Sequence, residues 1–138
     1  MLSTDEKLAL IHTHLDAEGD GDVETACSVY ADGIEHDVVG FPGAPCFGIE
    51  AAKEFYAYLT ANLRTTGEKT LHQFQTAEGA VVLEAEMSAD VIGEFMGLPG
   101  NNRSITFRIL HVFEFDDSLI TREQVWLDSG SIVAQLSA

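Results

Sequence analysis

Apolar residues at the start of the chain recur at the spacing of amphipathic helices. Leu8, Ile11 and Leu15 stand at i, i+3 and i+7, and a similar period returns between residues 23 and 30. Because such positions share one side of a helix, the pattern predicts two short helices. The segment 18–22 between them is acidic and contains two glycines, which predicts a tight turn.

A strand and a longer helix are expected next. Residues 34–39 are β-branched at both ends and lead into a Pro-Gly-Ala-Pro segment, which favours a short strand. From Ile49 the apolar positions hold the helical period until Gly67, and this spacing predicts the longest helix of the chain.

From about Lys69 the period of the apolar positions changes from 3.6 residues to 2. This alternation predicts four strands, over residues 69–76, 80–92, 104–116 and 119–133. Short turn-like segments between them favour antiparallel pairing. Helices first and strands later predict one α+β domain over residues 1–138, in which a bent antiparallel sheet packs against the helices and can enclose a cavity.

Composition narrows the classes of function. Apolar residues make up 46% and charged residues 22% of the 138 positions, which is typical of a folded globular protein. Acidic residues outnumber basic ones by 23 to 7, and the resulting charge of −16 repels nucleic-acid phosphates and anionic membrane surfaces. We therefore expect neither nucleic acid nor a membrane as a partner.

The N-terminal residues and the cysteines predict a cytoplasmic protein. Residues 1–7 lack the features of a signal peptide, and no apolar stretch approaches the ~20 residues of a membrane-spanning helix. Cys27 and Cys46 are expected to be free thiols, with Cys27 in the core, because disulfides are rare in reducing compartments.

Strand alternation places polar residues where apolar ones are expected. His111 alternates in phase with the isoleucines and phenylalanines of its strand, and His36 is in phase with apolar neighbours. On the last strand Asp128 is in phase with Trp126, unless a bulge reverses the alternation. If all three ionisable groups point inward, they meet in an apolar cavity also lined by Met87, where burial shifts their pKa values toward those needed for acid–base catalysis.

Simpler interpretations stay open for each of these residues. An inward histidine can be a hydrogen-bonded core residue, and Asp128 can have a structural role. His36, His111 and Asp128 also match the ligand types of an iron site with two histidines and one carboxylate, although no close ligand pair supports a metal. The side chains of His12 and His14 diverge on their helix, and we expect both to be solvated.

Four segments stand out as a set: Glu35-His36-Asp37, Gly48-Ile49-Glu50-Ala51, Asn102-Arg103-Ser104-Ile105-Thr106-Phe107, and His111-Val112-Phe113-Glu114-Phe115-Asp116-Asp117. They resemble the nuclear-transport-factor-2-like superfamily, and more specifically its SnoaL-like polyketide cyclase branch. The resemblance covers nearly the whole chain.

The resemblance implies a cone-shaped α+β barrel with a pocket at one end, and often a homodimer packed through the outer sheet face. It also implies that His111 and His36 occupy positions of pocket-facing polar groups. The last strand departs from the cyclase pattern Trp-Asp-x-Trp-Asp, whose first Asp is the acid–base group. Here Val125 takes that place and only the second Asp remains, as Asp128, which favours a related proton transfer over cyclisation itself.

The expected function is acid–base chemistry without a cofactor on a small apolar carbonyl or polyketide-like compound. The expected catalytic residues are His111, Asp128 and His36, and loss of either His111 or Asp128 should reduce turnover at least ~100-fold. The expected substrate-binding residues are Trp126, Met87, Phe107, Phe113, Tyr56 and Gln124. The alternative is a ligand-binding or dimerisation module of the same fold that turns nothing over.

Overall fold

Side-chain caps set the starts of the first two helices. In the computed structural model, which describes residues 1–138, α1 spans Thr4–Gly19 and begins where the Ser3 hydroxyl accepts a hydrogen bond from the Glu6 amide. α2 spans Val23–Cys27 and begins where Asp22 accepts from the Thr25 amide. Such caps satisfy amides that have no partner within the helix. The two predicted N-terminal helices are confirmed.

The third helix is shorter than predicted and is not the longest helix of the chain, since it has 14 residues and α1 has 16. α3 spans Ile49–Asn62 and does not continue to Gly67, because the chain turns at Leu63 into strand β3, Leu63–Gln75. β3 pairs with the next strand along its whole length, and this pairing begins at Leu63 opposite Val91. Ladder hydrogen bonds to a neighbouring strand therefore replace the helical ones that the local pattern favoured.

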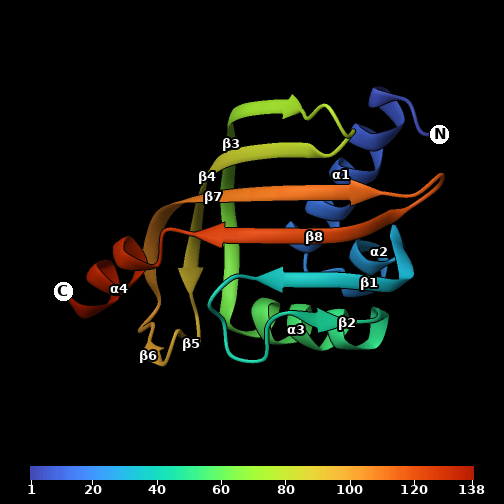
Figure 1. Cartoon of the computed structure of the whole chain (residues 1–138). Helices are drawn as coiled ribbons and strands as arrows, with labels where there is room; N and C mark the ends of the chain where they lie inside the picture. Colours follow the sequence, from blue (N-terminus) through green and yellow to red (C-terminus); the bar gives the residue numbers. More distant parts are fainter.

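Six strands form one curved sheet in the order β2-β1-β8-β7-β4-β3, and a small hairpin of β5 and β6 stands apart. The bounds of the strands other than β3 are β1 Tyr30–Val38, β2 Cys46–Phe47, β4 Val81–Val91, β5 Glu94–Phe95, β6 Leu98–Pro99, β7 Arg103–Phe115 and β8 Ile120–Leu127. Figure 1 shows that β3 and β4 bend strongly and that α1, α2 and α3 lie on one side of the sheet. The predicted α+β class, with helices on a bent antiparallel sheet, is confirmed.

One pair of strands differs from the antiparallel prediction. β1 and β8 run parallel, whereas every other neighbouring pair is antiparallel. Parallel neighbours need a long crossover connection, and here most of the chain lies between the two strands. The pair places residues from both ends of the sequence side by side in the middle of the sheet.

The last predicted strand, 119–133, is two elements. β8 ends at Leu127, and α4 follows over Ser129–Ser137. The Asp128 side chain caps this helix by accepting a hydrogen bond from the Ser131 amide. Ile132 and Leu136, four residues apart, are both buried against the sheet, so a helical stripe and not strand alternation describes this segment.

The predicted inward face of β8 is wrong as well, because the pairing of β8 with β7 sets the opposite alternation. In β8, Val125 pairs with His111 of β7, and paired residues of an antiparallel ladder point to the same face. Because His111 points inward, Glu123 and Val125 point inward too, whereas Trp126 is 48% exposed on the outer face.

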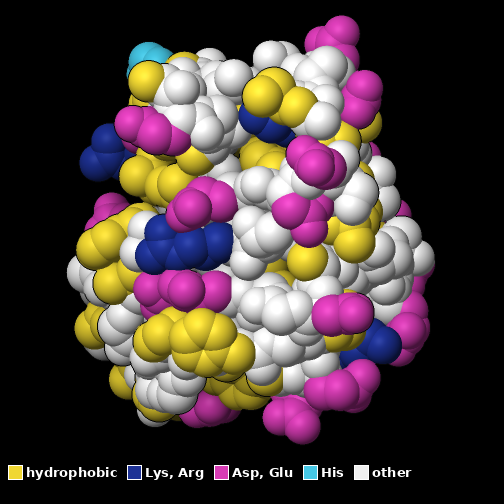
Figure 2. Space-filling view, turned by 45° about the vertical axis from the view of Figure 1, so that its right-hand side comes forward, with side chains coloured by type: hydrophobic (Ala, Val, Ile, Leu, Met, Phe, Trp, Pro, Cys, Tyr) yellow, Lys and Arg dark blue, Asp and Glu magenta, His cyan; other side chains and the backbone are white.

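The acidic surface and the free cysteine thiols agree with what the sequence predicts. Figure 2 shows acidic side chains spread over one face of the molecule, with few basic side chains and apolar patches between them. Cys27 is buried and Cys46 half-buried, and both are free thiols. No helix combines the length and the apolar character that crossing a membrane requires.

Candidate functional site

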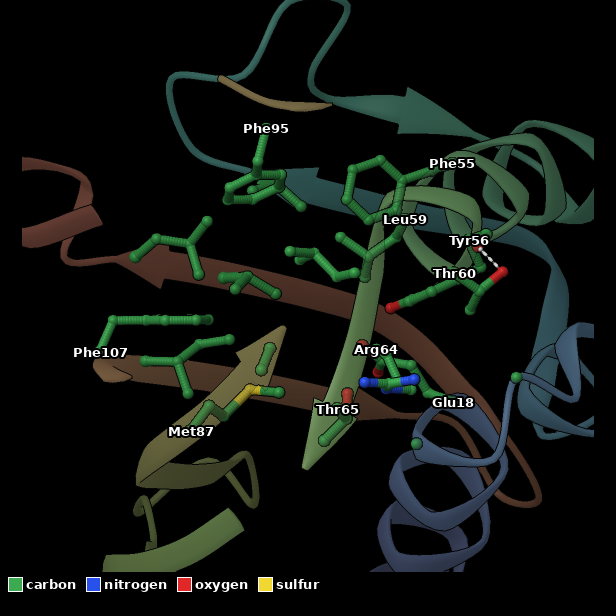
Figure 3. Close-up of a pocket in the computed structure, with 18 of the residues that line it drawn as sticks. Glu18, Phe55, Tyr56, Leu59, Thr60, Arg64, Thr65, Met87, Phe95 and Phe107 are labelled. Atoms are coloured by element: carbon green, nitrogen blue, oxygen red, sulfur yellow. Dashed lines mark hydrogen bonds between the residues drawn. The ribbon is translucent and has the colours of Figure 1, made fainter. Parts of the chain in front are cut away.

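The helices and the concave face of the sheet enclose an inner cavity of about 290 Å³. Its apolar part includes Phe55, Leu59, Met87, Phe95 and Phe107 (Figure 3). Polar side chains line another part of the same wall: Glu18, His36, Tyr56, His111 and Glu123. A small apolar compound can therefore lie along the cavity with one polar group against these side chains.

Glu123 of β8 is the centre of the polar end and is completely buried. Its Oε2 atom lies 3.0 Å from Nδ1 of His111, and its Oε1 atom lies 3.0 Å from Nε2 of His14. The hydroxyl of Tyr30 also donates a hydrogen bond to Oε1. A buried carboxylate is tolerated only when it is paired and hydrogen-bonded, and these three partners meet that condition.

His14 supplies the positive charge that balances Glu123. Its Nδ1–H donates to the backbone carbonyl of Ala26 at 2.7 Å, which turns Nε2 toward the carboxylate. Burial lowers the pKa of His14, but the Glu123 carboxylate outweighs burial, and the pKa rises to about 9. Burial raises the pKa of Glu123, but the His14 cation holds it well below its usual range. The two residues therefore form a buried ion pair at neutral pH.

Two tyrosines connect this ion pair to His36. The hydroxyl of Tyr56 lies 3.1 Å from that of Tyr30 and 2.8 Å from Nε2 of His36. Burial raises the pKa of both tyrosines well above the usual value, so both keep their protons. Burial also lowers the pKa of His36, which favours the neutral imidazole.

His111 has one ring nitrogen that is committed and one that is free. Its Nδ1–H donates to Glu123, so in the neutral ring Nε2 carries the lone pair. Nε2 is buried and has no hydrogen-bond partner in the protein. The ring stacks on Phe113 with centroids 5.4 Å apart, which holds its plane. An oriented imidazole with a free lone pair at the cavity wall is suited to accept a proton.

The structure brings together five of the predicted site residues. His111, His36, Tyr56, Met87 and Phe107 all line the inner cavity. Their catalytic and binding roles stay predictions.

Four predicted site residues do not line the cavity. Phe113 is fully buried beneath the ring of His111, within the core. Gln124 and Trp126 point to the outer face of β8, and the amide of Gln124 donates to Asp37 there. Asp128 is exposed and caps α4. The predicted convergence of Asp128 with the two histidines is therefore wrong, because the pairing of β8 with β7 sets the opposite alternation.

The residues that hold the polar end together, Glu123, His14 and Tyr30, were not predicted as site residues. The expectation that His14 is solvated is wrong, since its side chain is completely buried. A local signal existed: Ile11, His14 and Glu18 stand at i, i+3 and i+7, so they share one helix face. No comparable local signal marks Glu123, whose position depends on the register of β8.

A second hollow of about 660 Å³ adjoins the inner cavity. The two share His36, Val38, Phe41 and Phe55 in their walls. Phe41 packs edge-on against Phe55 and also contacts Phe95, so aromatic rings separate the two spaces. Of the polar side chains in the wall of the inner cavity, the second hollow reaches only His36.

The candidate site has no arrangement of metal ligands. No group of three or more His, Cys, Asp or Glu side chains stands where it could hold a metal ion. His36 and His111 both line the cavity, but Asp128 lies outside it, so the three-residue iron site considered from the sequence does not form.

Comparison with known proteins identifies a family. The sequence model described as SnoaL-like polyketide cyclase matches residues 10–136. No curated protein matches the sequence significantly.

Solved structures share the fold over nearly the whole chain. TsrD from Streptomyces laurentii has a TM-score of 0.84 at 17% identity, covering 100% of this chain and 99% of its own. A candidate polyketide cyclase from Xanthomonas campestris pv. campestris has a TM-score of 0.81 at 20% identity, covering 96% and 97%. An LEH-like epoxide hydrolase from M. tuberculosis has a TM-score of 0.74 at 19% identity, covering 97% and 91%. At these identities the likeness concerns the fold alone.

Proposed function

Because the chain belongs to the SnoaL-like polyketide cyclase family, we propose that it catalyses proton transfer on a small, apolar carbonyl compound, with His111 as the general base. The observation that carries the proposal is the buried, unpartnered Nε2 of His111 in the wall of the inner cavity. Its tautomer is set by the hydrogen bond from Nδ1 to Glu123. The residues of the chain supply this chemistry without a cofactor.

In the proposed step, the lone pair on Nε2 of His111 takes a proton from the carbon next to the carbonyl. The C–H bond breaks, an N–H bond forms, and the electron pair moves onto the carbonyl oxygen to give an enolate. Glu123 stabilises the imidazolium that results, because its carboxylate already accepts from Nδ1. Glu123 thus acts as a positioning residue through His111.

Tyr56 and His36 are the proposed partners of the carbonyl oxygen. Both line the cavity and are joined by a hydrogen bond of 2.8 Å. The high pKa of Tyr56 keeps its hydroxyl protonated, so it can donate a hydrogen bond to a developing oxyanion.

The walls define the class of substrate. The inner cavity lies near the lower end of the range typical of small-molecule pockets, roughly 300–1,000 Å³, and Met87, Phe95 and Phe107 make much of it apolar. A carboxylate or phosphate on the substrate would meet the buried charge of Glu123 and the acidic surface of the chain. We therefore propose an uncharged ketone or polyketide-like ring as the substrate.

The test uses cyclohexanone, a small apolar ketone, in deuterated water. The protein should accelerate exchange of the protons next to the carbonyl, measured by proton NMR, and His111→Ala should reduce this acceleration at least ~100-fold, as loss of a general base does. His72→Gln is the control, because the His72 side chain is 74% exposed on the surface.

Two outcomes would contradict the proposal. If His111→Ala exchanges protons as fast as the wild type, His111 is not the base. If the wild type binds cyclohexanone in the cavity without accelerating exchange, the protein is a ligand-binding module of this fold.

A homodimer packed through the outer face of the sheet is also proposed. Leu110 and Trp126 are paired on this face, and Val112, Val82 and Phe74 follow one another across β7, β4 and β3. Trp126 is 48% and Phe74 57% exposed, and burial of such apolar side chains favours association with a second copy. Sedimentation equilibrium should find a dimer that Val112→Lys weakens, and a monomeric wild type would refute the proposal.

The free state of Cys27 and Cys46 supports a cytoplasmic location, which stays part of the proposal. Fractionation of the source cells with an antibody against the chain would test it, and recovery outside the cytoplasm would contradict it.

A further inference from the structure

We propose that Glu18 is a second proton donor and acceptor of the inner cavity, which delivers a proton to a substrate carbon other than the one that His111 deprotonates. This inference rests on the proposed function and adds a catalytic residue to it. Three observations support it: the position of Glu18, its lack of structural hydrogen bonds, and its electrostatic surroundings.

Glu18 lies beside His111 although the two residues come from distant parts of the chain. It stands in the last turn of α1, just before a turn in which Gly21 has a positive φ of 76°. Both Glu18 and His111 line the inner cavity, and both also line a small recess together with Thr65 and Met87. Figure 3 shows Glu18 on the side of the pocket where Thr65 lies, away from the apolar side chains of Phe95 and Phe107.

The carboxyl group of Glu18 has no structural task comparable to that of Glu123. Its side chain is only 15% exposed, yet it accepts no hydrogen bond from the protein. Its closest charged neighbour is Nε2 of His14 at 3.6 Å, a distance longer than a hydrogen bond. His14 is closer to Glu123, at 3.0 Å. The Glu18 carboxyl therefore remains available to a molecule in the cavity.

Ionisable groups on four elements surround Glu18. Burial raises its pKa, His14 of α1 lowers it, Glu123 of β8 raises it, and His111 of β7 lowers it; the result is about 7. Glu68 of β3 adds a smaller repulsion. Arg64, on the same strand, forms an ion pair with Asp90. Both the acid and the carboxylate are therefore populated near neutral pH, which suits a group that gives and regains a proton.

The proposed step conserves atoms and electrons. His111 Nε2 takes a proton from the carbon next to the carbonyl of a β,γ-unsaturated ketone, and a dienolate forms. The O–H bond of the Glu18 carboxylic acid then breaks, and a C–H bond forms at the γ carbon, which leaves a conjugated ketone and a carboxylate. Transfer of the proton from the His111 imidazolium to the Glu18 carboxylate restores both groups.

The experiment compares two rates in the same full-length protein. The probe is cyclohex-3-en-1-one in deuterated water, whose α-deuteration reports proton removal and whose conversion to cyclohex-2-en-1-one reports proton delivery at the second carbon. Glu18→Gln should lower the ratio of conversion to α-deuteration at least about tenfold, since a neutral amide cannot donate an acidic proton. Glu6→Gln, an exposed change on the same helix, should leave the ratio unchanged.

A pH series adds a readout that a purely structural role would not move. In the wild type the ratio should fall as pH rises through about 7, because the acid form of Glu18 is lost. The ratio in Glu18→Gln should not change over this range. Carbon-13 NMR of labelled glutamate carboxyls should show one resonance titrating near the same pH in the wild type and missing in Glu18→Gln.

The outcomes separate this inference from the proposed function. Absence of α-deuteration by the wild type would overturn the proposed function, and the role of Glu18 with it. Deuteration without conversion, conversion unaffected by Glu18→Gln, or titration of Glu18 in the ordinary range of a glutamate would overturn the inference about Glu18 alone.

Discussion

Replacing Glu123 with Gln tests the buried ion pair directly. The substitution keeps the size of the side chain and removes its charge, so the protonated ring of His14 loses its partner at 3.0 Å. An amide cannot accept hydrogen bonds from His14, His111 and Tyr30 at once, because one end of it is a donor. We therefore expect His14 to give up its proton and the folded state to lose the free energy that the ion pair contributed.

The pKa of His14 sets the magnitude of this loss. Its rise from 6.5 to about 9 corresponds to about 3 kcal/mol in favour of the folded state when the unfolded ring is protonated. Removal of one partner from a buried ion pair typically costs about 3–5 kcal/mol, which is of the same size. These two free energies describe the same interaction, so they are not added. Glu123→Gln should thus lower the free energy of unfolding by about 3 kcal/mol at pH 6.

The sign of the pH dependence follows from the raised pKa. A folded pKa above the unfolded value means that the stabilisation by His14 is complete below about pH 6.5 and disappears as pH rises through about 9. Between pH 7 and 9 the wild type should therefore lose stability, whereas Glu123→Gln should lose much less.

Urea unfolding followed by far-ultraviolet circular dichroism from pH 6 to pH 9.5 measures both effects. Glu6→Gln is the control, since it removes an exposed carboxylate from α1. A Glu123→Gln protein that is as stable as the wild type at pH 6, or that keeps the full wild-type slope above pH 7, would refute the existence of the ion pair.

Two further substitutions, each with a matched control variant, test other hydrogen bonds by the same unfolding measurement. Tyr30→Phe removes the hydroxyl that donates to Glu123 and should cost about 1.5–3 kcal/mol, as hydrogen bonds to charged groups do. Tyr58→Phe, whose hydroxyl donates to Glu94 near the surface, should cost less than about 0.5 kcal/mol, and equal losses in the two variants would contradict a special role for Tyr30. Asp128→Ala should cost about 1 kcal/mol by removing the cap of α4, whereas Asp128→Asn, which can still cap, should cost much less. If Asp128→Ala leaves the free energy of unfolding unchanged, the capping role is ruled out.

Several features of the fold were predictable because they depend on residues close in the sequence. The helical period of residues 8–15 and the alternation around His111 each identify an element and its buried face. The pocket-facing positions of His36 and His111 follow from such alternation, since β1 and β7 have no bulge at these residues. A clear local period therefore predicts both the type of element and its inward side chains.

In the last part of the chain, the local period of apolar residues does not predict the structure. Residues 119–133 alternate well enough to suggest a strand, yet the side chain of Asp128 begins a helix within them. The alternation of β8 can be assigned to either face until its partner is known, and only the pairing of Val125 with His111 turns Glu123 inward. Asp128, predicted as catalytic, is thereby on the surface, and the unpredicted Glu123 is at the centre of the polar end.

The sequence by itself determined the first three helices, the strands that carry His36 and His111 and the inward direction of these two side chains, because helical and strand periods are local properties of a chain. Only the tertiary structure decided that His14, Glu123 and Tyr30 meet in one buried cluster and that Glu18 lies beside His111. The physical reason is that a buried charge is stable only beside a specific partner. That partner comes from another element, whose register is set by the whole sheet.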